Sequence, residues 1–143
     1  MLFRLLLVVG ALAVAFASPV SARRIHQHPH HRFHQSYTRA DGETVVGGRP
    51  AGCPSRFCGC GASLHLFGRI IPSLNLAANW LRFPRTAPAP RMAAVRPGHV
   101  FVLEQHLSGD VWLVYDSNSG GQKTRVHPRS IAGYAVVNPT GAA

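Results

Sequence analysis

Acidic residues are scarce in this chain of 143 residues, which has 5 Asp and Glu against 15 Lys and Arg. The resulting formal charge of +10 favours anionic partners such as nucleic acid, anionic lipid headgroups or an acidic cell-wall polymer. The basic residues of the second half fit either an anion-binding face or an ordinary solvated surface. They are Arg82, Arg85, Arg91, Arg96, Lys123, Arg125 and Arg129.

Long apolar runs are also scarce. One run, residues 5–16, follows Arg4 and precedes the small residues of segment 20–22 (Val-Ser-Ala). This three-part pattern predicts a secretory signal over residues 1–22, cleaved after Ala22. An uncleaved anchor is the alternative, but the run is short for a span of about 20 residues. No later run is long enough to cross a membrane, so we expect an exported periplasmic or extracellular protein without a membrane span after cleavage.

Cysteine is limited to Cys53, Cys58 and Cys60. In an oxidising compartment an odd number of cysteines predicts one disulfide and one free thiol. The C-x4-C-x-C spacing, with no fourth ligand nearby, does not match the usual zinc sites. We therefore expect neither a metal at these cysteines nor a cofactor, and export argues against a nucleic-acid partner despite the charge.

Residues 23–52 are predicted to form a disordered linker, because they are turn-rich and have neither helical nor strand periodicity. Five of the nine histidines lie in the stretch 26–34. This tract is either a solvated spacer or a binding segment for nickel, copper or zinc ions, since closely spaced imidazoles chelate metals even without a fold. A folded domain is expected over residues 53–139, followed by a flexible tail over 140–143.

The folded segment predicts helices first and strands second. Ser55 is a plausible cap for a first helix over residues 56–67, which Gly68 ends. A second helix is expected to start at Pro72 and to end before Pro84.

Five short strands are expected after a proline-rich connector, with hairpin turn chemistry between the second and third. This order predicts an α+β fold, with two N-terminal helices packed on a small antiparallel sheet of about five strands. The expected strands cover residues 92–95, 99–105, 111–115, 123–127 and 134–138.

Helix position favours Cys58 as a nucleophile. If Ser55 is the cap, Cys58 is the third residue, where amide dipoles lower the pKa of a thiol. Cys60 lies about 200° further around the axis, on the apolar stripe, and fits a disulfide with Cys53. The spacing equally allows a Cys53–Cys58 disulfide with Cys60 buried.

His99 opens a strand, at a sheet rim from which it can reach the start of a packed helix. An imidazole there accepts a thiol proton and later protonates a leaving amine. Asp116 or Asn118, just beyond the partner strand, can orient the ring. The structural alternatives are a half-exposed strand histidine and two ordinary turn residues. His65 and His127 are interpreted as surface or packing histidines.

The order of these segments resembles that of the CHAP and NlpC/P60 superfamily, cysteine amidases and endopeptidases that act on peptidoglycan. The similarity covers roughly residues 57–138. It rests on Phe57-Cys58-Gly59 at a helix start, on residues 75–80 (Asn-Leu-Ala-Ala-Asn-Trp), on residues 88–95 leading into Gly98-His99-Val100, and on Asp116-Ser117-Asn118.

The resemblance implies a papain-like core and a hydrolase. Cys58 would be the nucleophile, His99 the base, and Asn118 or Asp116 the orienting group. The implied partner is peptidoglycan or another anionic cell-wall component. Phe57 stands where the family usually has tryptophan, so a non-catalytic module that binds the wall or a glycan on the same fold is the alternative.

Overall fold

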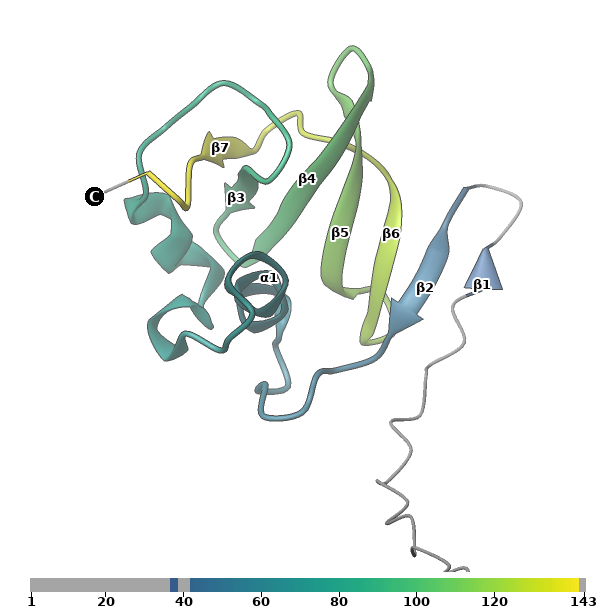
Figure 1. Cartoon of the computed structure of the whole chain (residues 1–143), viewed down its shortest axis with the longest axis vertical. Coiled ribbons are helices and arrows are strands. Elements are labelled where there is room, and N and C mark those ends of the chain that lie inside the picture. The colour runs from purple at the N-terminus through teal and green to yellow at the C-terminus, as the bar shows by residue number, and fades with distance from the viewer. Residues whose placement is uncertain (1–36, 39–41, 142–143) are drawn as a thin grey trace, which may run out of the picture. The chain divides into compact units, whose positions relative to one another are not determined.

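An antiparallel sheet and a small group of helices make up the α+β fold of this protein in a computed structural model (Figure 1), which describes residues 37–38 and 42–141. The predicted secretory signal and the His-rich tract lie outside the described residues. The elements in chain order are β1 (Tyr37–Thr38), β2 (Thr44–Gly47), α1 (Cys58–Phe67), the 3₁₀ helices η1 (Pro72–Leu74) and η2 (Ala77–Arg82), β3 (Ala93–Arg96), β4 (His99–Ser108), β5 (Val111–Ser119), β6 (Lys123–Ser130) and β7 (Ala135–Val137).

The sheet has seven strands in the order β1-β2-β6-β5-β4-β3-β7, and every neighbouring pair is antiparallel. The prediction of about five strands was too low, because it placed β1 and β2 within the linker. Val45 of β2 is buried and pairs with Arg125 of β6. The strand is short and bordered by glycines, so its own sequence carries little strand signal, and its pairing partner lies about 80 residues away.

Helix α1 starts at Cys58, so the predicted start at residue 56 and the Ser55 cap are wrong. Phe57 is the N-cap, has non-helical backbone angles and makes no side-chain cap hydrogen bond. The physical reason is the disulfide between Cys53 and Cys60, whose Cα atoms lie 5.7 Å apart. This link folds the preceding loop back against the first turn, and Cys58 becomes the first residue of the helix instead of the third.

The predicted second helix is wrong as one continuous helix, since the segment forms two 3₁₀ helices, η1 and η2, with extended backbone at Leu76 between them. Side chains occupy the carbonyls that an α-helix would use. The Trp80 indole donates to the Leu74 carbonyl at 2.8 Å and the Asn79 amide donates to the Ser73 carbonyl at 2.6 Å. No helix in the part of the chain that the structure describes is long and apolar enough to cross a membrane.

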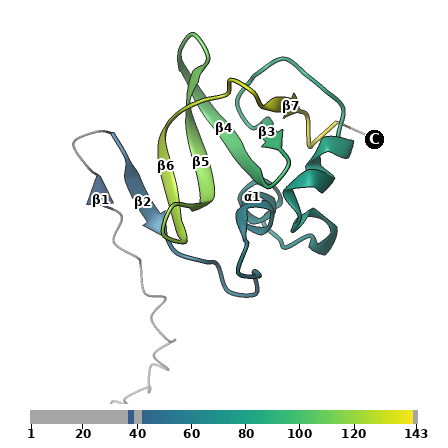
Figure 2. The same ribbon diagram turned by 180° about the vertical axis from the view of Figure 1, so that it is seen from behind.

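The two faces of the sheet bury separate cores. Helix α1 and η2 cover one face, where Ala62, Leu66 and Trp80 pack on Val100 and Val102 of β4. The other face buries Phe101, Leu103, Trp112 and Val114, with Tyr134 and Ile131 packed over them. Figures 1 and 2 show α1 beside the beginning of β4, with the β4–β5 hairpin tip at the far end of the sheet.

Glycines allow α1 to approach its neighbours closely. A Cβ atom at Gly61 would lie 2.1 Å from the Ser117 Oγ of β5, and one at Gly59 would lie 2.0 Å from the Leu74 carbonyl oxygen. Both separations are far below contact distance. The helix start can therefore lie against β5 at Gly61 and against η1 at Gly59 only because these two residues have no side chain.

A Gly61→Ala substitution tests this close approach. We expect it to lower the free energy of unfolding by about 2–3 kcal/mol, because overpacking forces backbone shifts in a packed core. Denaturant unfolding measures the change.

The matched control is Gly47→Ala, where nothing lies within 4 Å of an added Cβ, and its stability should change by less than about 0.5 kcal/mol. Addition of Ser117→Gly to Gly61→Ala should restore part of the lost stability. Equal unfolding midpoints for Gly61→Ala and the wild type would show that the helix does not approach β5 this closely.

Candidate active site

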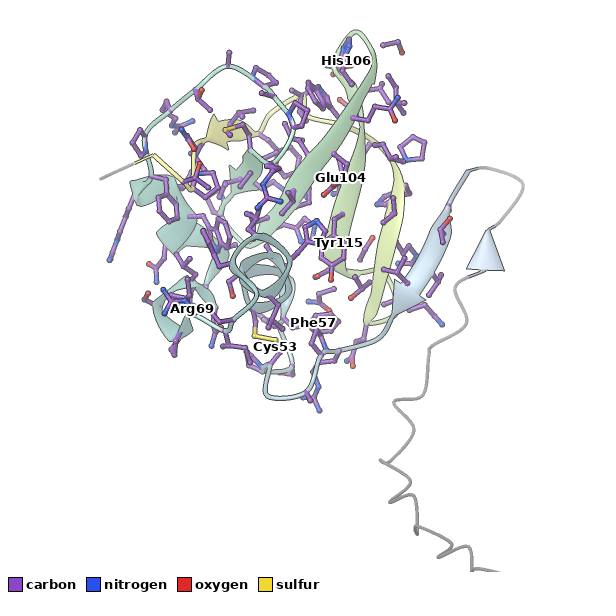
Figure 3. All side chains as sticks on the ribbon, in the orientation of Figure 1. Cys53, Phe57, Arg69, Glu104, His106 and Tyr115 are labelled. Carbon is purple, nitrogen blue, oxygen red and sulfur yellow. A yellow bond between two sulfur atoms is a disulfide. The ribbon has the colours of Figure 1, made fainter. Side chains whose placement is uncertain are left out.

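Cys58 is the free thiol, because the disulfide joins Cys53 to Cys60. Of the two pairings that the spacing left open, the structure has the one that leaves Cys58 unpaired. Figure 3 shows Cys53 and its disulfide beside the first turn of α1, close to the labelled Phe57. Phe57 and Cys60 are fully buried there and pack in a small cluster of their own. The disulfide thus fixes the turn of helix that carries the free thiol.

The Cys58 thiol lies between the start of α1 and the start of β4. Its Sγ is 3.9 Å from the Gly98 carbonyl oxygen. Burial by itself raises the pKa of the thiol. The hydrogen bond and charge of His99, together with the backbone N–H groups of Val100 and Gly59, outweigh burial and hold the pKa below its ordinary value. The surroundings of Cys58 therefore favour the thiolate.

His99 is the first residue of β4 and links the thiol to a buried carboxylate. Its Nε2 lies 2.8 Å from the Asp116 Oδ1, which leaves Nδ1 as the ring nitrogen available to the thiol. Burial works to lower the pKa of His99. The hydrogen bonds and charges of Asp116 and Cys58 prevail and raise it to about 9. Imidazolium is therefore the dominant form of His99 at neutral pH.

Asp116 of β5 is 0 % exposed and is surrounded by cationic or polarisable partners. His127 Nε2 lies 3.2 Å from its Oδ2, and Arg129 Nη1 donates to the same oxygen. Burial alone would raise the pKa of this carboxyl. The hydrogen bonds of His127 and His99, with the charges of His99 and Arg129, hold the pKa far below its ordinary value. Asp116 is therefore a carboxylate at neutral pH.

Asn118, the other predicted orienting residue, does not occupy that role in the structure. It lies beside the thiol cleft and has a left-handed backbone, with φ of 58°. The chain advances three residues along β5, from Asp116 to Ser119, while β6 advances two, from Arg125 to Lys123. This bulge turns Asn118 into the cleft and leaves Asp116 as the carboxylate that faces His99.

Sequence reasoning missed His127 and Arg129. His127 was interpreted as an ordinary histidine and Arg129 as one of a basic cluster, yet both contact Asp116 from β6. A signal existed in the alternation of β6, where residues 125, 127 and 129 share one face. Recognising it required the pairing of β5 with β6, which sets Asp116 opposite Arg125.

A cleft of about 390 Å³ opens at the thiol and the imidazole. Its walls come from the loop before α1, the β3–β4 turn, the end of β5 and one residue of β6. None of the lining residues is acidic. They are Arg56, Cys58, Arg96, Gly98, His99, Asn118, Ser119, Gly120 and Arg129.

The site holds the elements of nucleophilic catalysis. A thiolate attacks an electrophilic carbon, an imidazolium can return a proton to a leaving group, and a carboxylate keeps the ring oriented and charged.

Among the described residues no group of three or more His, Cys, Asp or Glu side chains is arranged to hold a metal ion. No family model, curated protein or solved structure matches the chain.

A His99→Ala substitution tests the coupling between the ring and the thiol. We expect the pKa of Cys58 to rise to its ordinary value or above, because burial then acts without the compensating imidazolium. The pH dependence of the rate of Cys58 alkylation by iodoacetamide measures this pKa.

The control is His65→Ala, since His65 stacks on Tyr115 and pairs with Glu104. The thiol pKa in this variant should match that of the wild type. An unchanged thiol pKa in His99→Ala would refute the coupling.

An Asp116→Asn substitution tests the buried carboxylate. We expect the free energy of unfolding to fall by about 3 kcal/mol, the lower limit of the range for a broken buried pair, because Arg129 and His127 are partly exposed and can rehydrate. Asp110→Asn, on an exposed carboxylate, is the control and should have little effect.

The loss in Asp116→Asn should depend on pH. The lowered pKa of Asp116 gives stability that is present above its ordinary value of 3.8 and is lost as the pH falls further. The raised pKa of His99 gives stability that is complete below 6.5 and is lost as the pH rises through about 9. The difference from the wild type should therefore be largest between these limits, and a difference that does not vary with pH would contradict this assignment.

Proposed function

We propose that this protein is an exported thiol hydrolase, an amidase or endopeptidase that cleaves amide bonds of peptidoglycan. The observation that carries the proposal is the continuous set of contacts from Cys58 through His99 to Asp116 at the edge of an open cleft. These three residues come from three different elements, so the contacts are not a consequence of nearness in sequence.

The first chemical step is attack by the Cys58 thiolate on the carbonyl carbon of the scissile amide. A carbon–sulfur bond forms, and the carbonyl π electrons move to oxygen. Cys58 opens α1, where the first amide N–H groups have no partner within the helix. We expect the N–H of Cys58 itself to donate to the developing oxyanion, which is the kind of stabilisation on which acyl transfer depends most.

The second step is collapse of the tetrahedral intermediate. The carbon–nitrogen bond breaks while His99 donates its proton to the departing amine, and a thioester remains on Cys58. His99 then accepts a proton from a water molecule, whose hydroxide attacks the thioester carbon. The carbon–sulfur bond breaks, which releases the carboxylic acid and returns Cys58 as the thiolate. Asp116 holds the ring in position through both steps and, unlike His99, keeps its charge.

Sequence features support the substrate and the location. The segments that carry the resemblance to CHAP and NlpC/P60 proteins include all three residues of the site. In the proposed papain-like core, α1 corresponds to the helix that carries the catalytic cysteine, and β4 corresponds to the strand that carries the histidine. The signal pattern at residues 1–22 supports export, and the charge of +10 favours an anionic wall component.

One observation favours a second function, a non-catalytic module that binds the wall. Cys58 is 4 % exposed, so its sulfur has little open surface for a substrate carbonyl. In that case the arginine-lined cleft would bind an anionic part of the wall without cleavage. Binding to isolated sacculi that survives Cys58→Ser, with no hydrolysis by the wild type, would identify this second function.

Hydrolysis of purified muropeptides tests the first function. We expect Cys58→Ala to abolish cleavage, because no other residue can form the thioester. His99→Ala should reduce the rate at least about 100-fold, since general acid–base catalysis contributes a factor of this order. Chromatography and mass spectrometry of the products measure the rates and identify the bond that is cut.

The control is again His65→Ala, which should retain wild-type activity, and unfolding curves establish that each variant is folded. Undiminished hydrolysis by a folded Cys58→Ala protein would exclude the thiol mechanism.

A further inference from the structure

The cleft at Cys58 carries an unbalanced positive charge. Three arginines line it and no acidic residue does. The acidic side chains of the described residues are all engaged outside the cleft or beneath it. Glu43 pairs with Arg125, Glu104 with His65, Asp110 with Ser130, and Asp116 with the three partners already named.

The three arginines are not equivalent. The Arg129 guanidinium is already hydrogen-bonded within the protein, because it donates to Asp116 and to the Tyr134 hydroxyl, the latter at 2.9 Å. Arg56 and Arg96 are exposed, and neither forms an ion pair within the described part of the chain. Two guanidinium groups are thus free to bind an anion beside the thiol.

Arg96 is held in place before any ligand arrives. Its guanidinium carbon lies 4.9 Å from the centre of the Tyr134 ring, a cation–π contact that restricts the side chain. Its position on β3 is directly opposite His99 of β4, because the turn between these strands is closed by Gly98 with φ of 91°. A guanidinium ordered in this way loses less entropy when it binds a carboxylate in a bidentate manner.

Each of the two arginines is placed next to a different half of a bound amide, the amine half or the acyl half. His99 must lie next to the leaving nitrogen in order to protonate it, so Arg96, its cross-strand neighbour, lies on the side of the amine. Arg56 lies two residues before Cys58 in the loop that enters α1, on the side of the nucleophile and hence of the acyl group.

We infer that this site selects amide substrates that carry a free carboxylate on each side of the scissile bond, with Arg96 binding the one on the amine half and Arg56 the one on the acyl half. The orientation rests on the proposed function. Recognition of an anion beside Cys58 does not depend on catalysis.

Alkylation of Cys58 by iodoacetate and by iodoacetamide tests the recognition of an anion without a substrate. Both reagents form the same carbon–sulfur bond and release iodide, but one carries a carboxylate and the other a neutral amide. The ratio of their rates cancels any change in the thiol pKa, since both react with the same thiolate.

In the Arg56→Gln/Arg96→Gln double variant we expect the rate ratio of iodoacetate to iodoacetamide to fall about tenfold, or about threefold for each charge removed near the sulfur. The matched control is Arg69→Gln/Arg82→Gln, at two exposed arginines that do not line the cleft; it removes the same charge and should leave the ratio unchanged. Equal ratios in the double variant and the wild type would overturn the inference, whether or not the protein hydrolyses peptidoglycan.

Paired synthetic substrates test the orientation once cleavage is established. One pair has a carboxylate or a carboxamide on the amine half, and the other pair has the same difference on the acyl half. Arg96→Gln should reduce the kcat/KM preference for carboxylate about tenfold in the first pair alone, and Arg56→Gln in the second pair alone, as for a lost hydrogen bond to a charged group.

A preference that neither variant changes would refute the role of the arginines while leaving the thiol mechanism intact. A third outcome is possible: the double variant has a lower rate ratio of iodoacetate to iodoacetamide than the wild type, but the wild type cleaves no substrate. This outcome would refute the proposed function and leave the recognition of an anion intact.

Discussion

The buried carboxylate of Asp116 is the interaction on which the site depends. A charge with 0 % exposure is tolerated in a protein only when it is paired and hydrogen-bonded. Here the partners are His99 from β4 and His127 and Arg129 from β6, so the carboxylate joins the three central strands of the sheet. The same contacts keep His99 protonated opposite Cys58, and a structural ion-pair network thereby lowers the pKa of the thiol.

The strands were predictable from sequence to a greater extent than the helices were. The starts of β4 and β5 at His99 and Val111 are where strand-forming residues meet turn residues, and this pattern is local. The start of α1 is not local, because a disulfide and the burial of Phe57 determine it. The two 3₁₀ helices depend on the burial of Trp80 in the core beneath the sheet and on its hydrogen bond to Leu74, and β2 depends on pairing with a distant strand.

The candidate site was predictable where the chemistry is carried by residue type, as for Cys58 and His99. The choice between Asp116 and Asn118 was not, because a one-residue bulge in β5 decides which of them faces the ring. His127 and Arg129 reach Asp116 through the register of β5 with β6, which no spacing along the chain encodes. The pKa values of the three site residues were not predictable either, because all three depend on burial.

The most direct test of this account is a nuclear magnetic resonance titration of the His99 ring nitrogens in the intact protein. The contacts with Asp116 and Cys58 predict that His99 stays protonated at neutral pH and titrates with a pKa of about 9. Titration at or below the ordinary value of 6.5 would contradict the account, because His99 would then be neutral and could not hold Cys58 as a thiolate.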